Sequence, residues 1–134
     1  MAKTSSQRLH DAQQAMASIQ RFVPSEPRER LNNDLTRSAV ERKLSIVQEA
    51  LRVALLQDPA LRQSWPDLDA VMRRCARLRD WEDPVSVEEL AGFVDADLQN
   101  WQGRIASLLK HQQDEGSRLD QQTGENLRRL GYEF

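Results

Sequence analysis

The chain has 134 residues and a formal net charge of −2, and 30% of its residues are charged. This length suits one domain with one core, and the charge balance provides no overall basic field for nucleic acid. The single cysteine, Cys75, excludes an internal disulfide. No apolar run approaches the roughly 18 residues that a membrane-spanning helix requires. The polar amino terminus argues against a secretory signal, so we expect a cytoplasmic protein.

Apolar residues at steps of three and four predict a first helix, with Ser5 or Ser6 as its N-cap and Pro24 just beyond its end. Its apolar face consists of Leu9, Ala12, Met16, Ile19 and Val23. The same periodicity predicts one long second helix from about Pro27 to Gln57, which would form the spine of the fold. Its apolar face consists of Leu31, Leu35, Ala39, Ile46, Val47, Ala50, Val53 and Ala54.

Two further helices follow a short segment that begins near Asp58 and restarts at Pro66. The third has its apolar face at Leu68, Val71, Met72, Cys75 and Leu78. A turn at residues 80–84 leads to Ser86 and Glu89, a capping-box pattern that predicts the start of the fourth helix. The apolar face of that helix is Val87, Leu90, Val94, Leu98, Trp101, Ile105 and Leu108.

The sequence becomes almost wholly polar after Lys110, which predicts a polar tail or an exposed helical extension over residues 111–134. The expected architecture is therefore all-α: a four-helix up-and-down bundle in residues 1–110, followed by this extension. Tyr132 and Phe134 restore apolar character at the end and are candidates to contact the bundle or a partner.

The stretch from Leu35 to Leu109 resembles the HepT-like family of the HEPN superfamily of toxin–antitoxin proteins. The resemblance rests on a long helix with arginine and acidic residues (39–50), a loop with leucine and proline (61–68) and a last helix beginning at the acidic capping pattern of Ser86. It implies a helical bundle that forms a homodimer. It also implies a protein partner, typically a nucleotidyltransferase, in a toxin–antitoxin or antiphage defence system.

In that family an arginine, a histidine and a tyrosine two residues further on form the motif for RNA cleavage. The histidine transfers a proton and the arginine stabilises charge on the phosphate. The matching segment here has Arg74, Arg79 and Trp81 at those places, and the chain's only histidines are His10 and His111. Because arginine stays protonated at neutral pH, it does not replace the histidine, and we expect no catalytic residue in this segment.

The third helix carries a basic cluster, which consists of Arg73, Arg74, Arg77 and Arg79. One interpretation is an anion or RNA site. The other is that these arginines pair with acidic residues close in sequence, as is usual on charged helix faces. Those acids are Asp67, Asp69, Asp80, Glu82 and Asp83.

Trp101 falls on the apolar face of the fourth helix and is predicted to lie in the core. Trp65 precedes a proline at a helix junction and is predicted to close one end of the bundle. Trp81 lies in a turn beside charged residues and is either an interface residue or a cap over the core. The two histidines have no partners at ligand spacing, so we expect no metal site. No sequence motif indicates a cofactor.

These features favour a non-catalytic HepT-like module that forms a homodimer and binds a protein partner. Two alternatives remain open at this point. The chain could be a ribonuclease toxin in which His10 or His111 reaches the basic cluster, or an RNA-binding protein that uses residues 73–79 without cleavage.

Overall fold

The computed structural model describes residues 3–112, and the regular structure in this range is helical, without strands. The elements are α1 (Ser5–Phe22), α2 (Pro27–Leu31), α3 (Asp34–Gln57), α4 (Leu61–Ser64), α5 (Leu68–Leu78), α6 (Val87–Gly92) and the π-helical turn η1 (Phe93–Asp97). Helical conformation continues over 98–112, which we call the last helical segment. The expectation of an all-α protein is confirmed for the described range. Tyr132, Phe134 and the rest of the predicted tail from 113 onward lie outside it.

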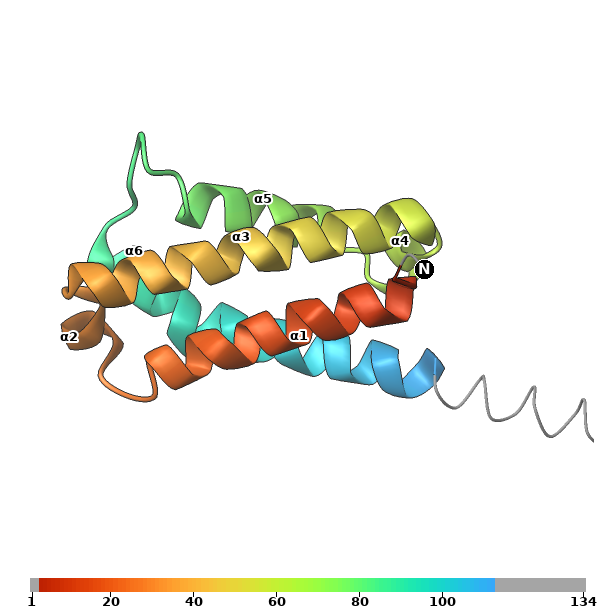
Figure 1. Ribbon diagram of the computed structural model, residues 1–134, viewed down its shortest axis with the longest axis horizontal. Helices are drawn as coiled ribbons and strands as arrows, with labels where there is room; N and C mark the ends of the chain where they lie inside the picture. Colours follow the sequence, from red (N-terminus) through yellow and green to blue (C-terminus); the bar gives the residue numbers. More distant parts are fainter. Residues whose placement is uncertain (1–2, 113–134) are drawn as a thin grey trace, which may run out of the picture.

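The longer helices lie side by side and run in alternating directions along the chain (Figure 1). α1 packs along α3, and α5 also packs against α3. α6, η1 and the last helical segment form the remaining long element, and α2 contacts α6 at one end. At the opposite end Gln57 Nε2 donates a hydrogen bond to the backbone oxygen of Lys3 at 2.7 Å, which joins the end of α3 to the start of α1.

One apolar core forms between these helices because each contributes an apolar stripe. On α3 the predicted stripe is only partly right, since Ala39, Ile46 and Val53 are half-buried. The buried residues of α3 are Val40, Leu44, Val47, Ala50, Leu51, Ala54 and Leu55. All five predicted core residues of the first helix are buried, as are Trp65 and Trp101. Phe93 is fully buried and its ring centroid lies 5.1 Å from that of Trp101, in a tilted arrangement. The aromatic pair therefore lies where η1 and the last helical segment meet the rest of the core.

The prediction of one long helix from Pro27 to Gln57 is wrong, because the chain breaks at residues 32–33 into α2 and α3. The side chain of Asn33 caps α3 by accepting a hydrogen bond from the backbone N–H of Thr36 at 3.1 Å. An asparagine that binds its own backbone in this way competes with helix continuation. Leu35, which was predicted to lie in the core, is 82% exposed in the first turn of α3.

Two smaller corrections concern helix ends and helix type. Thr4, rather than Ser5 or Ser6, caps α1, in a reciprocal capping box with Gln7. Ser86 caps α6 as predicted, since its Oγ accepts from the backbone N–H of Glu89 at 3.1 Å. The fourth helix is not uniform, because η1 inserts a π-helical turn at Phe93–Asp97. Turns of this type are rare and widen the helix locally.

None of the helices within residues 3–112 is both long enough and apolar enough to cross a membrane.

Candidate functional site

The basic cluster predicted from the sequence lies on α5, and its members point to different partners. Arg74 forms two ion pairs with residues of later helices. Its Nη1 lies 2.9 Å from Glu89 Oε1, and its Nε lies 3.5 Å from Asp97 Oδ2. Arg74 therefore joins α5 to both α6 and η1. Its guanidinium is matched by two carboxylates, so it is not a free anion-binding group.

Arg77 and Arg79 are engaged as well, near the end of α5. Arg77 Nη1 donates to the backbone oxygen of Asp83 at 2.6 Å and lies 3.5 Å from the Asp83 carboxylate. Arg79 Nε donates to Gln48 Oε1 on α3 at 2.7 Å. Arg79 thus connects the end of α5 to α3.

Arg73 is exposed, as is Arg77. The pKa of Asp69 is lowered mainly by the hydrogen bond from Arg62, and the charge of Arg73 contributes to the same shift. The four arginines therefore do not converge on one anion site in the described structure. Three of them are paired, but only the partner of Arg77, Asp83, is among the acids predicted from nearby sequence. The partners of Arg74 and Arg79 come from other helices.

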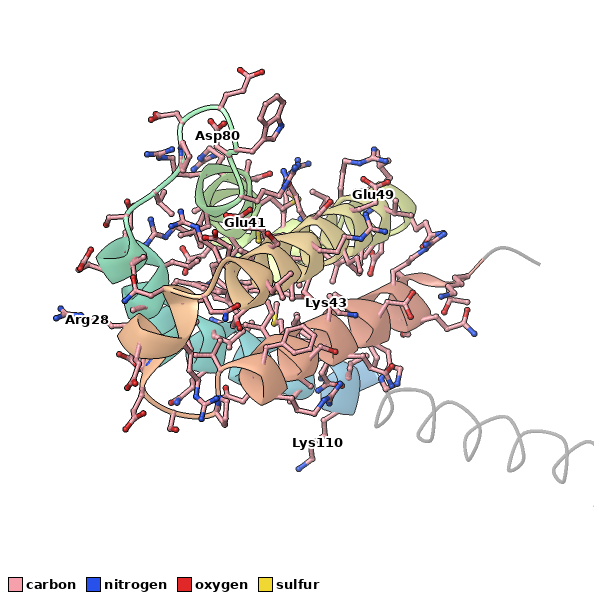
Figure 2. All side chains as sticks on the ribbon, turned by 60° about the vertical axis from the view of Figure 1, so that its left-hand side comes forward. Arg28, Glu41, Lys43, Glu49, Asp80 and Lys110 are labelled. Atoms are coloured by element: carbon pink, nitrogen blue, oxygen red, sulfur yellow. The ribbon has the colours of Figure 1, made fainter. Side chains whose placement is uncertain are left out.

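The loop of residues 79–86, which we call the Trp81 loop, projects beyond the helices (Figure 1). Trp81 is 79% exposed, so it does not cover the core. The base of the loop is held at Asp80, whose Oδ1 accepts from the backbone N–H groups of Glu82 at 3.0 Å and Asp83 at 3.2 Å (Figure 2). An Asx-type turn and the Arg77 contact thus hold the backbone of the loop, and the ring of Trp81 lies in solvent with acidic residues on both sides of it in the sequence.

A cavity of about 320 Å³ lies beside Arg74, between α5 and the last helical segment. It is lined by Trp65, Asp67, Ala70, Val71, Arg74, Asp97, Asn100, Trp101 and Arg104. Within this cavity the carboxylate of Asp97 lies 3.5 Å from Arg74 and balances the positive charge of that side chain.

Within residues 3–112 the α5 arginines have no histidine among their hydrogen-bond partners. The partners of Arg74, Arg77 and Arg79 are carboxylates, a carbonyl and an amide, while His10 contacts Gln14 on its own helix at 3.1 Å. Cys75 is fully buried, and burial raises the pKa of its thiol to about 12. A thiol with that pKa is not a nucleophile at neutral pH.

Within residues 3–112, no three or more histidine, cysteine or acidic side chains come together in a group that could hold a metal ion. Comparison with known proteins gives no further indication of the site's role. No family model, curated protein or solved structure matches this chain.

Sequence reasoning missed the partners that occupy the arginines. Glu89 is 15 residues from Arg74, and Gln48 is 31 residues from Arg79. Pairing at such separations depends on how the helices pack, and a search for acids close in sequence does not find it. The exposure of Trp81 was foreseen as one of two outcomes, since a tryptophan among Asp and Glu residues in a turn has little apolar surface nearby.

Proposed function

We propose that this chain is a non-catalytic, HepT-like interaction module that binds a protein partner through the Trp81 loop. The observation that carries this proposal is the 79% exposure of Trp81 on a loop whose backbone is held by hydrogen bonds. Exposed, preorganised tryptophans are typical anchors of protein interfaces.

The chemistry of the loop suggests the kind of surface that it contacts. Asp80, Glu82 and Asp83 surround Trp81, so the complementary surface is an apolar pocket with basic residues at its rim. The resemblance to HepT-like proteins suggests that the partner is a nucleotidyltransferase or another component of a toxin–antitoxin or antiphage defence system. We place this function in the cytoplasm.

The same proposal covers the finer architecture and the oligomeric state. We assign the described helices to a four-helix up-and-down bundle whose long members are α1, α3, α5 and the element from α6 through residue 112. We further propose a homodimer, to which the exposed side chain of Leu56 contributes apolar surface. Sedimentation at micromolar concentration tests this, and a monomer there contradicts the dimer.

The residues around α5 support the non-catalytic part of the proposal. Arg79, which stays protonated at neutral pH, is bonded to Gln48 in place of the motif's histidine. Incubation of the purified protein with structured and single-stranded RNA should leave both intact. Cleavage that disappears in His10→Ala or His111→Ala would contradict this part of the proposal.

The partner is tested with a matched pair of variants. Tagged wild-type protein, Trp81→Ala and Leu35→Ala are each used to capture proteins from the native host, since Leu35 is as exposed as Trp81 but lies on α3. A true partner is retained by Leu35→Ala and lost by Trp81→Ala. The purified partner should then bind Trp81→Ala about 30-fold more weakly than wild type, as expected for an interface anchor worth about 2 kcal/mol.

Equal capture by all three proteins would contradict the assignment to Trp81. Salt-sensitive RNA binding that is lost when Arg74 and Arg77 are replaced together would instead favour the RNA-binding alternative.

A further inference from the structure

A groove of about 520 Å³ runs along the seam between α1 and α3, away from the Trp81 loop and the α5 arginines. Its apolar floor is formed by Ala15, Ile46 and Ala50. Polar and charged residues from both helices line the rest. The positions repeat at helical spacing on each side, so the groove belongs to the rigid packing of α1 on α3 and not to a loop.

The charges around this groove do not balance. Its acidic residues are Asp11 and Glu49, and each already has a cation: Lys3 Nζ lies 2.8 Å from Asp11 Oδ2, and Arg52 Nη2 lies 2.7 Å from Glu49 Oε1. Three cationic side chains that line the groove form no ion pair within the described part of the chain. They are Arg8, Arg42 and Lys43.

Arg8 is the most informative of the three. Its Nε is buried, and it has no hydrogen-bond acceptor among residues 3–112. A buried N–H without an acceptor is destabilising by about 1–3 kcal/mol, and such groups are rare in folded proteins. The positive charge of Arg8 also contributes to lowering the pKa of Glu49, after the larger effect of the Arg52 hydrogen bond, which places Arg8 near that end of the groove.

Arg42 and Lys43 lie toward the other end. Figure 2 shows Lys43 along the seam between α3 and α1, with Glu49 further along α3. Seven residues separate Arg42 from Glu49, which corresponds to roughly 10 Å at the rise of an α-helix. The groove therefore has cations at both ends and an apolar floor between them.

We propose that this groove binds a phosphorylated organic anion of about mononucleotide size. Guanidinium groups match phosphate oxygens in charge and in hydrogen-bond geometry. The floor accommodates the less polar part of the ligand, and the volume lies within the range of roughly 300–1,000 Å³ that small-molecule sites occupy. The guanidinium of Arg8 binds the phosphate from one end of the groove, and the long side chains of Arg42 and Lys43 reach the same phosphate from the other.

The proposal is tested by calorimetric titration of the full chain with AMP, adenosine and inorganic phosphate. We expect AMP to bind at least tenfold more tightly than either of the other two, because only AMP engages both the cations and the floor. Adenosine or phosphate binding as tightly as AMP overturns the proposal, as does the absence of AMP binding at millimolar concentration.

Variants place the site. Arg8→Met and Lys43→Met keep an unbranched apolar stem while removing the charge, and each should weaken AMP binding at least tenfold. Arg73→Met is the matched control, since Arg73 is an exposed cation on α5, outside the groove, and its removal should leave AMP affinity unchanged. Equal affinities in wild type and Arg8→Met, or equal losses in all three variants, overturn the assignment.

Folding is followed separately by thermal denaturation. Arg8→Met removes a buried donor without an acceptor, so in the absence of AMP it should melt no lower than wild type. If Arg8→Met melts lower, Lys43→Met alone decides the question: retention of AMP binding in that variant overturns the proposal. Binding of a single-stranded RNA that is not displaced by AMP also contradicts it, since the groove would then serve a polymer.

Discussion

The arginines of α5 and the cations of the α1–α3 groove look alike in composition but differ in their surroundings. Arg74, Arg77 and Arg79 each contact an acceptor contributed by another part of the fold. Arg8, Arg42 and Lys43 come from two helices far apart in sequence and have no ion-pair partner among the described residues. Basic residues that are adjacent in a sequence can therefore be ion-paired within the fold as readily as they can form a binding site. Cations without a partner can be recognised only once the packing of the helices is known.

The largest expected effect tests whether α5 and the α1–α3 pair unfold together as one cooperative unit. Phe93 is fully buried against Trp101, and Phe93→Ala should lower the free energy of unfolding by about 3–5 kcal/mol through lost burial and a cavity. Urea denaturation followed by tryptophan fluorescence measures this loss. Leu35→Ala, at an 82% exposed site, is the control and should change stability by no more than about 0.5 kcal/mol. Two separate transitions in wild type would show that α5 and the α1–α3 pair unfold independently.

The second prediction concerns Cys75, a fully buried residue of α5. Burial raises the pKa of its thiol to about 12, from an ordinary value of 9.0. Below pH 9 the thiol is protonated in both states, so its contribution to stability is constant. Between pH 9 and 12 the unfolded chain loses the proton while the folded chain keeps it, and stability should therefore fall by up to about 1.4 kcal/mol per pH unit.

Urea denaturation at several pH values between 8 and 10.5 measures this slope. Cys75→Ala is the control, because it lacks the thiol but keeps the other groups that titrate in this range. Identical pH slopes in the two proteins would mean that α5 does not keep the thiol away from water.

The third prediction compares a paired arginine with an unpaired one. Arg74→Met should lower the free energy of unfolding by about 1 kcal/mol, since it removes the contacts to Glu89 and Asp97 at a site where the side chain is 34% exposed. Arg42→Met in the α1–α3 groove should change stability by no more than about 0.5 kcal/mol. Chemical denaturation of both variants measures the difference. A larger loss for Arg42→Met would mean that the groove's cations serve the fold.

Much of the fold could be predicted because apolar periodicity reports directly on which face of a helix is buried. The stripe from Leu9 to Val23 and the burial of Trp101 followed from spacing alone. The break at Asn33 did not, because the apolar positions on either side continue at helical steps. An asparagine gives a weak signal of a cap until its side chain is seen to accept from Thr36.

The candidate sites were less predictable than the helices. The arginine-rich segment 73–79 attracted attention because its residues are adjacent in sequence, yet Glu89, Asp97 and Gln48 occupy them from other elements. The groove of Arg8, Arg42 and Lys43 has no signature in the sequence, since neither α1 nor α3 is unusually basic by itself. Charge that matters for binding depends on contacts between elements, and composition along one helix does not report them.

The smallest expected effect on stability concerns the Trp81 loop, where a substitution should weaken partner binding while leaving the free energy of unfolding almost unchanged. Asp80→Ala removes the acceptor for the backbone N–H groups of Glu82 and Asp83, which are exposed and can bind water instead. We therefore expect a change of less than about 0.5 kcal/mol in the free energy of unfolding. The loop should nevertheless become more mobile, so that partner affinity falls although Trp81 itself is retained, because ordering the loop then opposes binding. Titration of the purified partner against Asp80→Ala and Trp81→Ala measures both losses. If Asp80→Ala binds as tightly as wild type, the ring of Trp81 is sufficient and the held backbone of the loop does not contribute to recognition.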